Sequence, residues 1–372
     1  MMALTPRPGI MNIAPYVGGE SNLPGQNRVI KLASNESPLG PSPRAMEAYK
    51  ALASELHRYP DGGAVKLREA LAHHHALDAA RIVCGAGSDE LIGLLVRAYA
   101  GPGDEVLYSR HGFLMYPIAA QSVGATPVTA PERELTADID ALLARVTPRT
   151  RILFLANPNN PTGSCLPAAE VKRLRDRLAP DVLLVLDAAY AEYVTRPDYE
   201  AGAALVERHD NVVMLRTFSK IYGLAALRIG WAYCPPAVAD VLNRVRGPFN
   251  TAMAAQAAAV AALEDRGHTE KARAHNDRWL PWFSKQVRGL GLVPHPSFGN
   301  FVLVEFPAAT GGAEKALAFL NGRGVIPRRM AGYGLPDCLR FTIGTAEEME
   351  LTVAALREFT GHDREAGRGG TR

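Results

Sequence analysis

Residues 212–220 read Val-Val-Met-Leu-Arg-Thr-Phe-Ser-Lys, a short apolar run that ends in polar side chains. Two similar runs precede it. Arg151–Ala156 leads into the turn Asn157-Pro-Asn-Asn-Pro-Thr-Gly163, and Val182–Leu186 leads into Asp187-Ala-Ala-Tyr190. A buried strand has no structural need for such ends, whereas ligands bind at the carboxyl ends of strands in open parallel sheets. We therefore expect an asparagine, an aspartate with a tyrosine, and a serine–lysine pair to meet at one site.

The region around these runs has an alternating pattern. From about residue 41 to 250, short apolar runs alternate with helix-period segments, which predicts an α/β fold with a parallel sheet covered on both faces. Further strands, also with both faces buried, are expected at 81–84, 105–108 and 126–129. Helices are expected at Ser88–Ala100, where Ser88 can cap the start, and at Thr251–Arg266.

The two ends of the chain have different patterns. The first 40 residues are rich in Pro, Gly and Asn and predict an extended arm. Beyond about residue 280, strand-like Asn300–Phe306 and Leu339–Ile343 alternate with helical Ala313–Gly322 and Ala346–Thr360, which predicts a smaller α+β unit. We therefore predict an arm over 1–40, a large domain over 41–255, a small C-terminal domain over 256–360 and a disordered tail over 361–372.

Composition excludes several classes of protein. Apolar residues make up 47% of the chain, and 41 Lys and Arg against 38 Asp and Glu leave a net charge of +3, which disfavours a disordered chain or a nucleic-acid binder. There is no stretch of about 18 apolar residues, so we expect a cytoplasmic protein that is not a membrane protein. The cysteines lack the spacing of a disulfide framework, zinc site or dithiol centre: Cys84, Cys165, Cys234 and Cys338.

Two polar clusters have ordinary explanations. His73-His74-His75 cannot easily close on one metal ion, because consecutive helix positions point about 100° apart. Lys172, Arg173 and Arg175 are expected to form a solvated helix face. We predict no metal site.

The segment Thr217-Phe-Ser-Lys-Ile-Tyr-Gly-Leu-Ala-Ala-Leu-Arg228-Ile-Gly-Trp231 resembles the fold-type I aminotransferases that depend on pyridoxal 5'-phosphate (PLP), specifically their histidinol-phosphate aminotransferase branch. The resemblance extends from Ala14-Pro-Tyr-Val17 to Leu339-Arg-Phe-Thr-Ile-Gly-Thr345. It implies PLP as cofactor, a large domain with a mostly parallel seven-stranded sheet between helices, and a smaller α+β C-terminal domain.

The resemblance assigns roles to the residues at the strand ends. Lys220 is implied to form the Schiff base with PLP and to move a proton, which requires the amine to be neutral; partial burial near other cations lowers a lysine pKa. Asp187 is implied to pair with the pyridine nitrogen and keep the ring protonated as an electron sink. Asn160 and Tyr190 match residues that hydrogen-bond the phenolic oxygen of the ring.

Other matched residues are implied to hold the rest of the cofactor. Gly85-Ala-Gly-Ser88 follows a strand and opens a helix, an arrangement that binds phosphate through backbone amides. The resemblance implies that the phosphate is held by the amides of Ala86, Gly87 and Ser88, the Ser219 hydroxyl and the Arg228 guanidinium. Phe113 is implied to stack on the pyridine ring. Tyr59 is implied to reach the phosphate of a second subunit, which predicts a homodimer with active sites at the interface.

Substrate recognition is implied to use arginines. Arg340 matches the residue that binds a substrate α-carboxylate with two parallel hydrogen bonds. Arg328 matches an arginine near the distal end of the substrate, and Tyr16 a tyrosine that closes over it. Asn35 and Asn250 are weaker candidates for the pocket. The wording Pro327-Arg328-Arg329 departs from the Val-Arg-Pro of close relatives, so either arginine could face the substrate.

The resemblance implies transamination of L-histidinol phosphate with 2-oxoglutarate, giving imidazole-acetol phosphate and L-glutamate in a ping-pong sequence. Three alternatives stay open at this point. The same machinery could serve phenylalanine and tyrosine, it could decarboxylate a phosphorylated amino acid, or the chain could be a non-catalytic PLP-binding protein.

Overall fold

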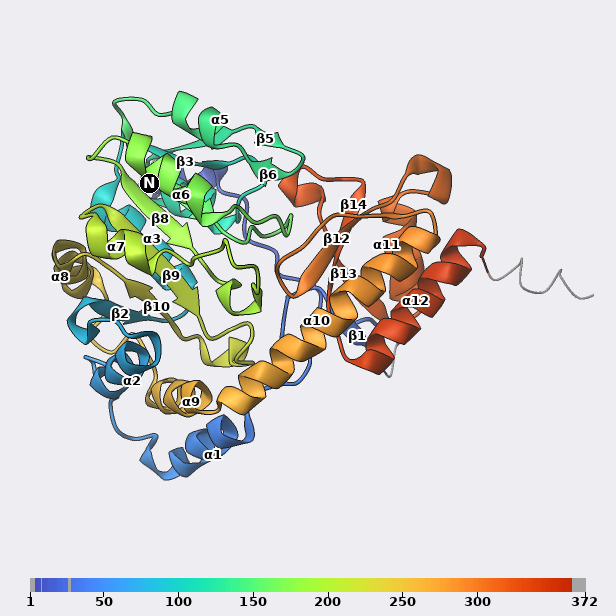
Figure 1. Cartoon of the computed structure of the whole chain (residues 1–372), viewed down its shortest axis with the longest axis horizontal. Helices are drawn as coiled ribbons and strands as arrows, with labels where there is room; N and C mark the ends of the chain where they lie inside the picture. Colours follow the sequence, from blue (N-terminus) through green and yellow to red (C-terminus); the bar gives the residue numbers. More distant parts are fainter. Residues whose placement is uncertain (1–3, 8, 26–27, 363–372) are drawn as a thin grey trace, which may run out of the picture.

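The computed structural model describes residues 4–7, 9–25 and 28–362, and within them two main sheets lie side by side (Figure 1). The larger sheet has seven strands in the order β2 (Ile82–Gly85), β10 (Gly230–Tyr233), β9 (Val212–Thr217), β8 (Leu183–Asp187), β7 (Thr150–Ala156), β3 (Glu105–Ser109) and β4 (Thr126–Ala130). Only β10 runs against its neighbours within this sheet. The expected mostly parallel sheet is confirmed, and the six strands expected from the sequence agree to within one residue at either end.

Helices cover both faces of this sheet, as expected. Alternate residues of β8 point to opposite sides: Leu184 joins one apolar core, and Val185 joins the other. The first core is covered by α1 (Pro43–Ala51), α2 (Val65–His75), α5 (Ile139–Ala144), α6 (Ala168–Arg177), α7 (Ala203–Arg208) and α9 (Met253–Glu264), and the second by α3 (Ser88–Tyr99), α4 (Met115–Ser122) and α8 (Pro236–Val245). The expected burial of both faces is wrong for β4, because it is an edge strand with Thr126 and Thr129 exposed.

The smaller sheet is mixed. Its order is β1 (Ile30–Leu32), β13 (Val325–Arg329), β14 (Cys338–Thr342), β12 (Phe301–Glu305) and β11 (Val293–Pro294), and it packs against α10 (Arg266–Gly289), α11 (Ala313–Gly322) and α12 (Ala346–Thr360). A separate hairpin joins β5 (Glu132–Arg133) to β6 (Thr136–Ala137). Part of the expected extended arm is thus a strand, since β1 pairs in parallel with β13.

The packing of α9 bears on the division of the chain. The predicted boundary between residues 255 and 256 falls inside α9, whose buried Ala258 and Ala262 belong to a core of the large sheet. We therefore propose that the large unit extends to the end of α9, from where α10 leads to the small sheet (Figure 1). Of the predicted disordered tail, residues 363–372 lie outside the described residues; Gly361 ends α12 with a positive φ.

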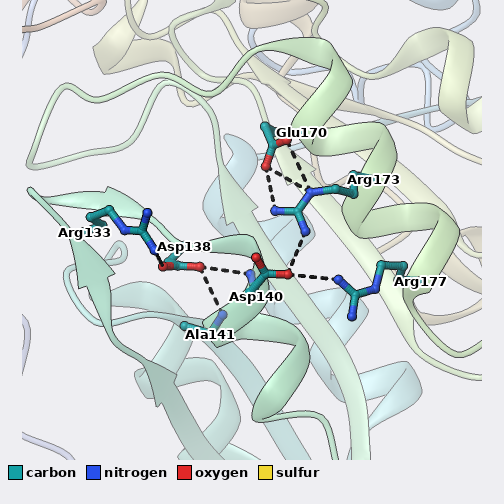
Figure 2. A network of polar contacts seen from close by, with 7 residues as sticks. All are labelled: Arg133, Asp138, Asp140, Ala141, Glu170, Arg173 and Arg177. Atoms are coloured by element: carbon teal, nitrogen blue, oxygen red, sulfur yellow. Dashed lines mark hydrogen bonds and ion pairs between the residues drawn. The ribbon is translucent and has the colours of Figure 1, made fainter.

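A polar network joins α5 to α6 on the surface (Figure 2). The Asp140 carboxylate accepts hydrogen bonds from Arg173 (2.7 Å) and Arg177 (2.9 Å), and Arg173 also pairs with Glu170 at 2.8 Å. These contacts fit the expectation of a solvated face at Arg173. The expectation is wrong for Arg175, which is buried and donates to the Leu178 carbonyl oxygen at 3.1 Å.

Candidate active site

A cavity of about 380 Å³ lies at the carboxyl ends of β7, β8 and β9, facing the small sheet. The polar residues expected from the three strand ends all line it: Asn160, Asp187, Tyr190, Ser219 and Lys220. Further predicted residues join them there: Tyr16, Asn35, Ser88, Phe113, Arg228, Arg328 and Arg340. The structure therefore brings together most of the side chains selected from the sequence.

Lys220 lies in the cavity with a lowered pKa. Burial and the nearby positive charge of Arg340 lower the pKa of Lys220 to about 8. Its Nζ lies 3.4 Å from the carbonyl oxygen of Ser34 and 5.8 Å from the centre of the Tyr190 ring. A lysine with this pKa is partly neutral near pH 7 and can act as a nucleophile or as a proton carrier.

Asp187 lines the cavity, and its two carboxylate oxygens have different surroundings. Its Oδ2 accepts a 2.8 Å hydrogen bond from the Tyr116 hydroxyl, while Oδ1 is buried with no hydrogen-bond partner among the described residues. Burial raises the pKa of Asp187 to about 6. A buried carboxylate oxygen without a partner is costly, so this atom is suited to accept a hydrogen bond from a ligand.

Tyr190 and Asn160 are held from the small-sheet side. The Tyr190 hydroxyl accepts a 2.8 Å hydrogen bond from Asn35 Nδ2, and burial raises the pKa of Tyr190 to about 12. The Asn160 side-chain oxygen accepts a hydrogen bond from Arg340, which also donates to the Ala33 carbonyl oxygen at 2.9 Å. Both residues keep polar atoms at the cavity, where they can bind an oxygen of a ligand.

The start of α3 lies at the cavity, where Ser88 and Asp89 line it. The helix begins at Ser88, and its N-cap Gly87 makes no side-chain cap hydrogen bond, so the expectation that Ser88 caps the helix is wrong. Ser88 is the first helical residue, and the amides of a first turn have no acceptor within the helix. Arg228 approaches this turn so closely that a Cβ on Gly87 would lie 2.4 Å from Nη2; with a φ of +84°, this position requires glycine.

The phosphate-binding roles expected for the backbone amides of Ala86 and Gly87 are not supported. The Ala86 amide donates to Glu90 Oε2 at 2.6 Å, and the Gly87 amide donates to the Gly85 carbonyl oxygen at 2.8 Å. Neither residue lines the cavity, whereas Ser88 and Asp89 do. We therefore shift the proposed amide donors to Ser88 and Asp89. The helix itself begins at Ser88, as the sequence predicted.

Fixed charge completes this end of the cavity. Arg228 donates to the Ser219 hydroxyl at 3.3 Å and pairs with the Asp89 carboxylate at 2.9 Å. The guanidinium and the helix start together favour an anion such as a phosphate. Phe113 also lines the cavity, and its ring meets that of Tyr116 edge to face with centroids 6.0 Å apart.

The small sheet supplies the other end. Arg340 on β14 is 5% exposed, and its Nε has no hydrogen-bond partner among the described residues. Arg328 on β13 lines the cavity, with its guanidinium carbon 5.9 Å from the centre of the Tyr16 ring. Arg329 points to the opposite side of the strand and pairs with Glu314 at 2.6 Å. Of the two candidate arginines, Arg328 is therefore the one that faces the cavity.

Two further selected residues, besides Ala86 and Gly87, do not line the cavity. Asn250 donates to the Cys84 carbonyl oxygen at 3.1 Å and to Glu90 Oε2 at 2.8 Å, so it braces the turn before α3 instead. Tyr59 is 80% exposed and stacks on Phe249 with ring centres 4.6 Å apart.

Two tyrosines at the site were missed in the sequence. Tyr116 contacts Asp187, and Tyr333 lines the cavity. Tyr116 lies in an apolar helical stretch, where a tyrosine is more readily interpreted as core. Tyr333 lies in a Gly-rich loop between two strands, and the proximity of that loop to Arg340 along the chain was the signal that could have identified it.

Comparison with known proteins defines the class first. The model of the family described as aminotransferase class I and II matches residues 27–356. Over 362 residues, the chain is 64% identical to the histidinol-phosphate aminotransferase of Paramagnetospirillum magneticum, covering 97% of this chain and 100% of that protein. The histidinol-phosphate aminotransferase of Rhodospirillum centenum is 62% identical, and the match covers 95% of this chain and 98% of that protein. The chain therefore belongs to the histidinol-phosphate aminotransferase branch of the class I and II aminotransferases.

A solved structure agrees with this assignment. The crystal structure of histidinol-phosphate aminotransferase from Sinorhizobium meliloti, in complex with pyridoxal-5'-phosphate, superposes with a TM-score of 0.88. The two chains are 30% identical, and the match covers 97% of this chain and 99% of the other. The expected fold is confirmed. In the described residues, no helix has the length and apolar character needed to cross a membrane.

Proposed function

We propose that this protein is a PLP-dependent enzyme that transfers the amino group of L-histidinol phosphate to 2-oxoglutarate, giving imidazole-acetol phosphate and L-glutamate. The observation that carries the proposal is the 64% identity to a histidinol-phosphate aminotransferase over the whole length of that relative. The cavity supports it independently, since Lys220, three arginines and a carboxylate oxygen that has no hydrogen-bond partner among the described residues lie around one space.

The residues present fit PLP. Asp187 Oδ1 is a buried acceptor that needs a donor, and the protonated pyridine nitrogen supplies one. Because Gly87 has no side chain, Arg228 can lie beside the start of α3, where a phosphate is favoured. Asn160 and Tyr190 would hold the phenolic oxygen, and Phe113 would pack on the ring. When bound, PLP supplies an aldehyde that links to amines and a ring that draws electrons from the substrate Cα.

Lys220 performs the proton transfer in this proposal. Because its pKa is lowered to about 8, the amine can lose a proton without a strong base and take it up again near neutral pH. With the cofactor bound, Nζ would take up the proton released from the substrate Cα and hold it within the cavity until it is returned. Its position beside the Tyr190 ring and the Ser34 carbonyl oxygen keeps the amine within the cavity.

Two arginines let one cavity accept two substrates. Arg340 would bind the α-carboxylate of glutamate, because its buried Nε still lacks a partner among the described residues. Arg328 would bind the phosphate of histidinol phosphate in one half-reaction and the side-chain carboxylate of glutamate in the other. Tyr16 and Tyr333 line the same space and would limit the entry of water.

We also propose a homodimer in which Tyr59 of each subunit contacts the phosphate in the other. The proposal is supported by the exposure of Tyr59 and its stacking on the half-exposed Phe249, away from the cavity of its own chain. A cytoplasmic location is proposed as well. All four cysteines are free and buried, as is usual in a reducing compartment.

The decisive experiment measures kcat/KM for L-histidinol phosphate beside phenylalanine and tyrosine, each with 2-oxoglutarate as acceptor. We expect histidinol phosphate to be preferred by at least about a hundredfold, because a phosphate paired with arginine is worth more than the contacts of an apolar ring. Similar values for all three donors would reject the assignment to histidinol phosphate and leave an aromatic aminotransferase.

A further inference from the structure

We propose that Tyr116 is a positioning residue whose hydroxyl holds Oδ2 of Asp187 so that Oδ1 is presented to the pyridine nitrogen of the cofactor. This inference rests on the proposed PLP chemistry and deepens it. The hydroxyl lies 2.8 Å from Oδ2, and the phenol is the donor because an ionised carboxylate can only accept. Tyr116 lies in α4 and Asp187 at the end of β8, so the contact links two separate elements.

The surroundings of Tyr116 fix the direction of its hydroxyl. Its ring stacks on Phe154 with centroids 4.5 Å apart and planes 5° apart, and meets Tyr108 and Phe113 edge to face at 5.9 and 6.0 Å. The side chain is 1% exposed, so water cannot readily replace the hydroxyl if it is removed. A tyrosine enclosed in this way has few other rotamers available.

The hydrogen bond also acts on the charge of Asp187. Burial raises the pKa of Asp187, and the hydrogen bond from Tyr116 opposes that rise by favouring the ionised form. The charge of Asp89 from α3 also raises the pKa of Asp187, whereas the backbone amide of Ala189 and the charge of Lys220 lower it. The neutral phenol of Tyr190 faces the carboxylate as well. Burial raises the pKa of Tyr116 itself well above 10, so its hydroxyl keeps its proton at every working pH.

Affinity for the cofactor should therefore change with pH in a defined direction. The ionised carboxylate binds the protonated ring nitrogen, so affinity for the cofactor is present above the pKa of Asp187 and is lost as pH falls through it. Without the Tyr116 hydroxyl, the pKa of Asp187 rises, and the midpoint of this loss moves to higher pH.

The test uses the apoprotein and pyridoxamine 5'-phosphate, which has the ring nitrogen and phosphate of the cofactor but no aldehyde, so the titration of Lys220 does not enter through covalent linkage. The equilibrium dissociation constant is measured from pH 5 to 9 for the wild type and Tyr116→Phe. For Tyr116→Phe we expect binding about tenfold weaker at pH 7, because one hydrogen bond to a charged group is lost. We also expect the midpoint of the pH dependence to lie at higher pH.

Tyr108→Phe is the matched control. It removes the same hydroxyl from a neighbouring buried tyrosine that makes no hydrogen bond to Asp187. We expect its affinity and midpoint to match the wild type. An equal effect of both substitutions would mean that loss of packing or stability, not contact with Asp187, is responsible, and would overturn the proposal.

A double-mutant cycle separates this inference from the proposed function. In an Asp187→Asn background, Tyr116→Phe should change affinity less than twofold, because the residue acts through the carboxylate. If Asp187→Asn weakens binding but Tyr116→Phe does not, the inference alone fails. If Asp187→Asn also has no effect, the proposed orientation of the cofactor fails with it.

A second variant covers the case in which Tyr116→Phe does not fold. Phe154→Leu keeps the hydroxyl but removes the ring stacked on Tyr116. It should move the midpoint in the same direction by a smaller amount. An unchanged midpoint in folded Phe154→Leu protein would count against the proposal.

Discussion

Asn35 Nδ2 donates a 2.8 Å hydrogen bond to the hydroxyl of Tyr190, although the two residues are 155 positions apart in the chain. Asn35 follows β1 of the small sheet, and its backbone amide donates to Thr342 Oγ1 in β14 at 2.9 Å. Tyr190 follows β8 of the large sheet. Both sheets therefore shape the site, and substitutions on either side should alter the chemistry at Lys220.

Replacing Lys220 with alanine should lower transamination by at least about 10²–10⁴-fold, because the enzyme loses its proton carrier. Purified Lys220→Ala protein incubated with PLP should acquire no label that borohydride can fix, as read by mass spectrometry. Lys172→Ala is the control, since Lys172 pairs with Asp176 on the exposed face of α6. A borohydride-fixed label that persists in Lys220→Ala would exclude Lys220.

The rate of covalent coupling between Lys220 and PLP should rise as pH increases through about 8 and level off above it, because only the neutral amine reacts. The Arg340 guanidinium lowers the pKa of Lys220, so Arg340→Gln should move the midpoint to higher pH. Stopped-flow absorbance measures both. Arg329→Gln, at an arginine paired with Glu314, should leave the midpoint in place. A midpoint unchanged by Arg340→Gln would contradict the proposed electrostatic coupling.

Arg340→Lys should raise KM for glutamate roughly 10–100-fold, since lysine keeps the charge but cannot bind a carboxylate with two parallel hydrogen bonds, worth about 1.5–3 kcal/mol. Steady-state kinetics with each amino donor provides an internal control. Histidinol phosphate has no α-carboxylate, so its KM should change much less. Equal increases for both donors would argue against carboxylate recognition by Arg340.

Arg328→Gln should raise KM for histidinol phosphate by about tenfold or more, because the phosphate loses a charge-assisted partner. The neighbouring Arg329→Gln is the matched control: that side chain is on the other side of β13 and pairs with Glu314. We expect the KM of Arg329→Gln for histidinol phosphate to stay within about twofold of the wild-type value. The reverse result would move the phosphate site to Arg329.

Mixing Tyr59→Phe subunits with Lys220→Ala subunits tests whether active sites are shared. If Tyr59 serves the other subunit, each hybrid dimer has one site that lacks both groups and one that is intact. Activity at limiting PLP should then recover toward half that of the wild-type dimer. The activity of Tyr59→Phe alone should be about tenfold lower under these conditions, because one hydrogen bond to the phosphate is lost. Mixtures no more active than their separate components would refute the shared site.

Much of the large sheet could be predicted because its strands are apolar runs that end abruptly in polar residues. Asp187 and Lys220 stand out for this reason, and both lie at the cavity. β10 was missing from the strands read off the sequence. It spans only Gly230–Tyr233, and its Gly and Ala have low strand propensity, so pairing with β2 and β9 on either side makes it a strand.

The remaining differences come from contacts made in the folded chain. The Ala86 amide donates its hydrogen bond to Glu90, and nothing in the glycine-rich sequence before α3 predicts this contact. Arg328 and Arg329 are adjacent in sequence, and only the register of β13 against β14 decides which one faces the cavity. Tyr116 resembles an ordinary core residue until its hydroxyl is seen beside Asp187.

The pairing of β1 with β13 sets the timing of assembly during translation. Ile30 pairs with Val325, so β1 leaves the ribosome long before its partner exists. At about 5–20 residues per second, the nascent chain waits on the order of tens of seconds, while the large sheet can already form. Asn35, Arg328 and Arg340 come together only once that edge closes. Newly made chains should therefore gain the substrate-binding half of the site last, after β13 and β14 have been made.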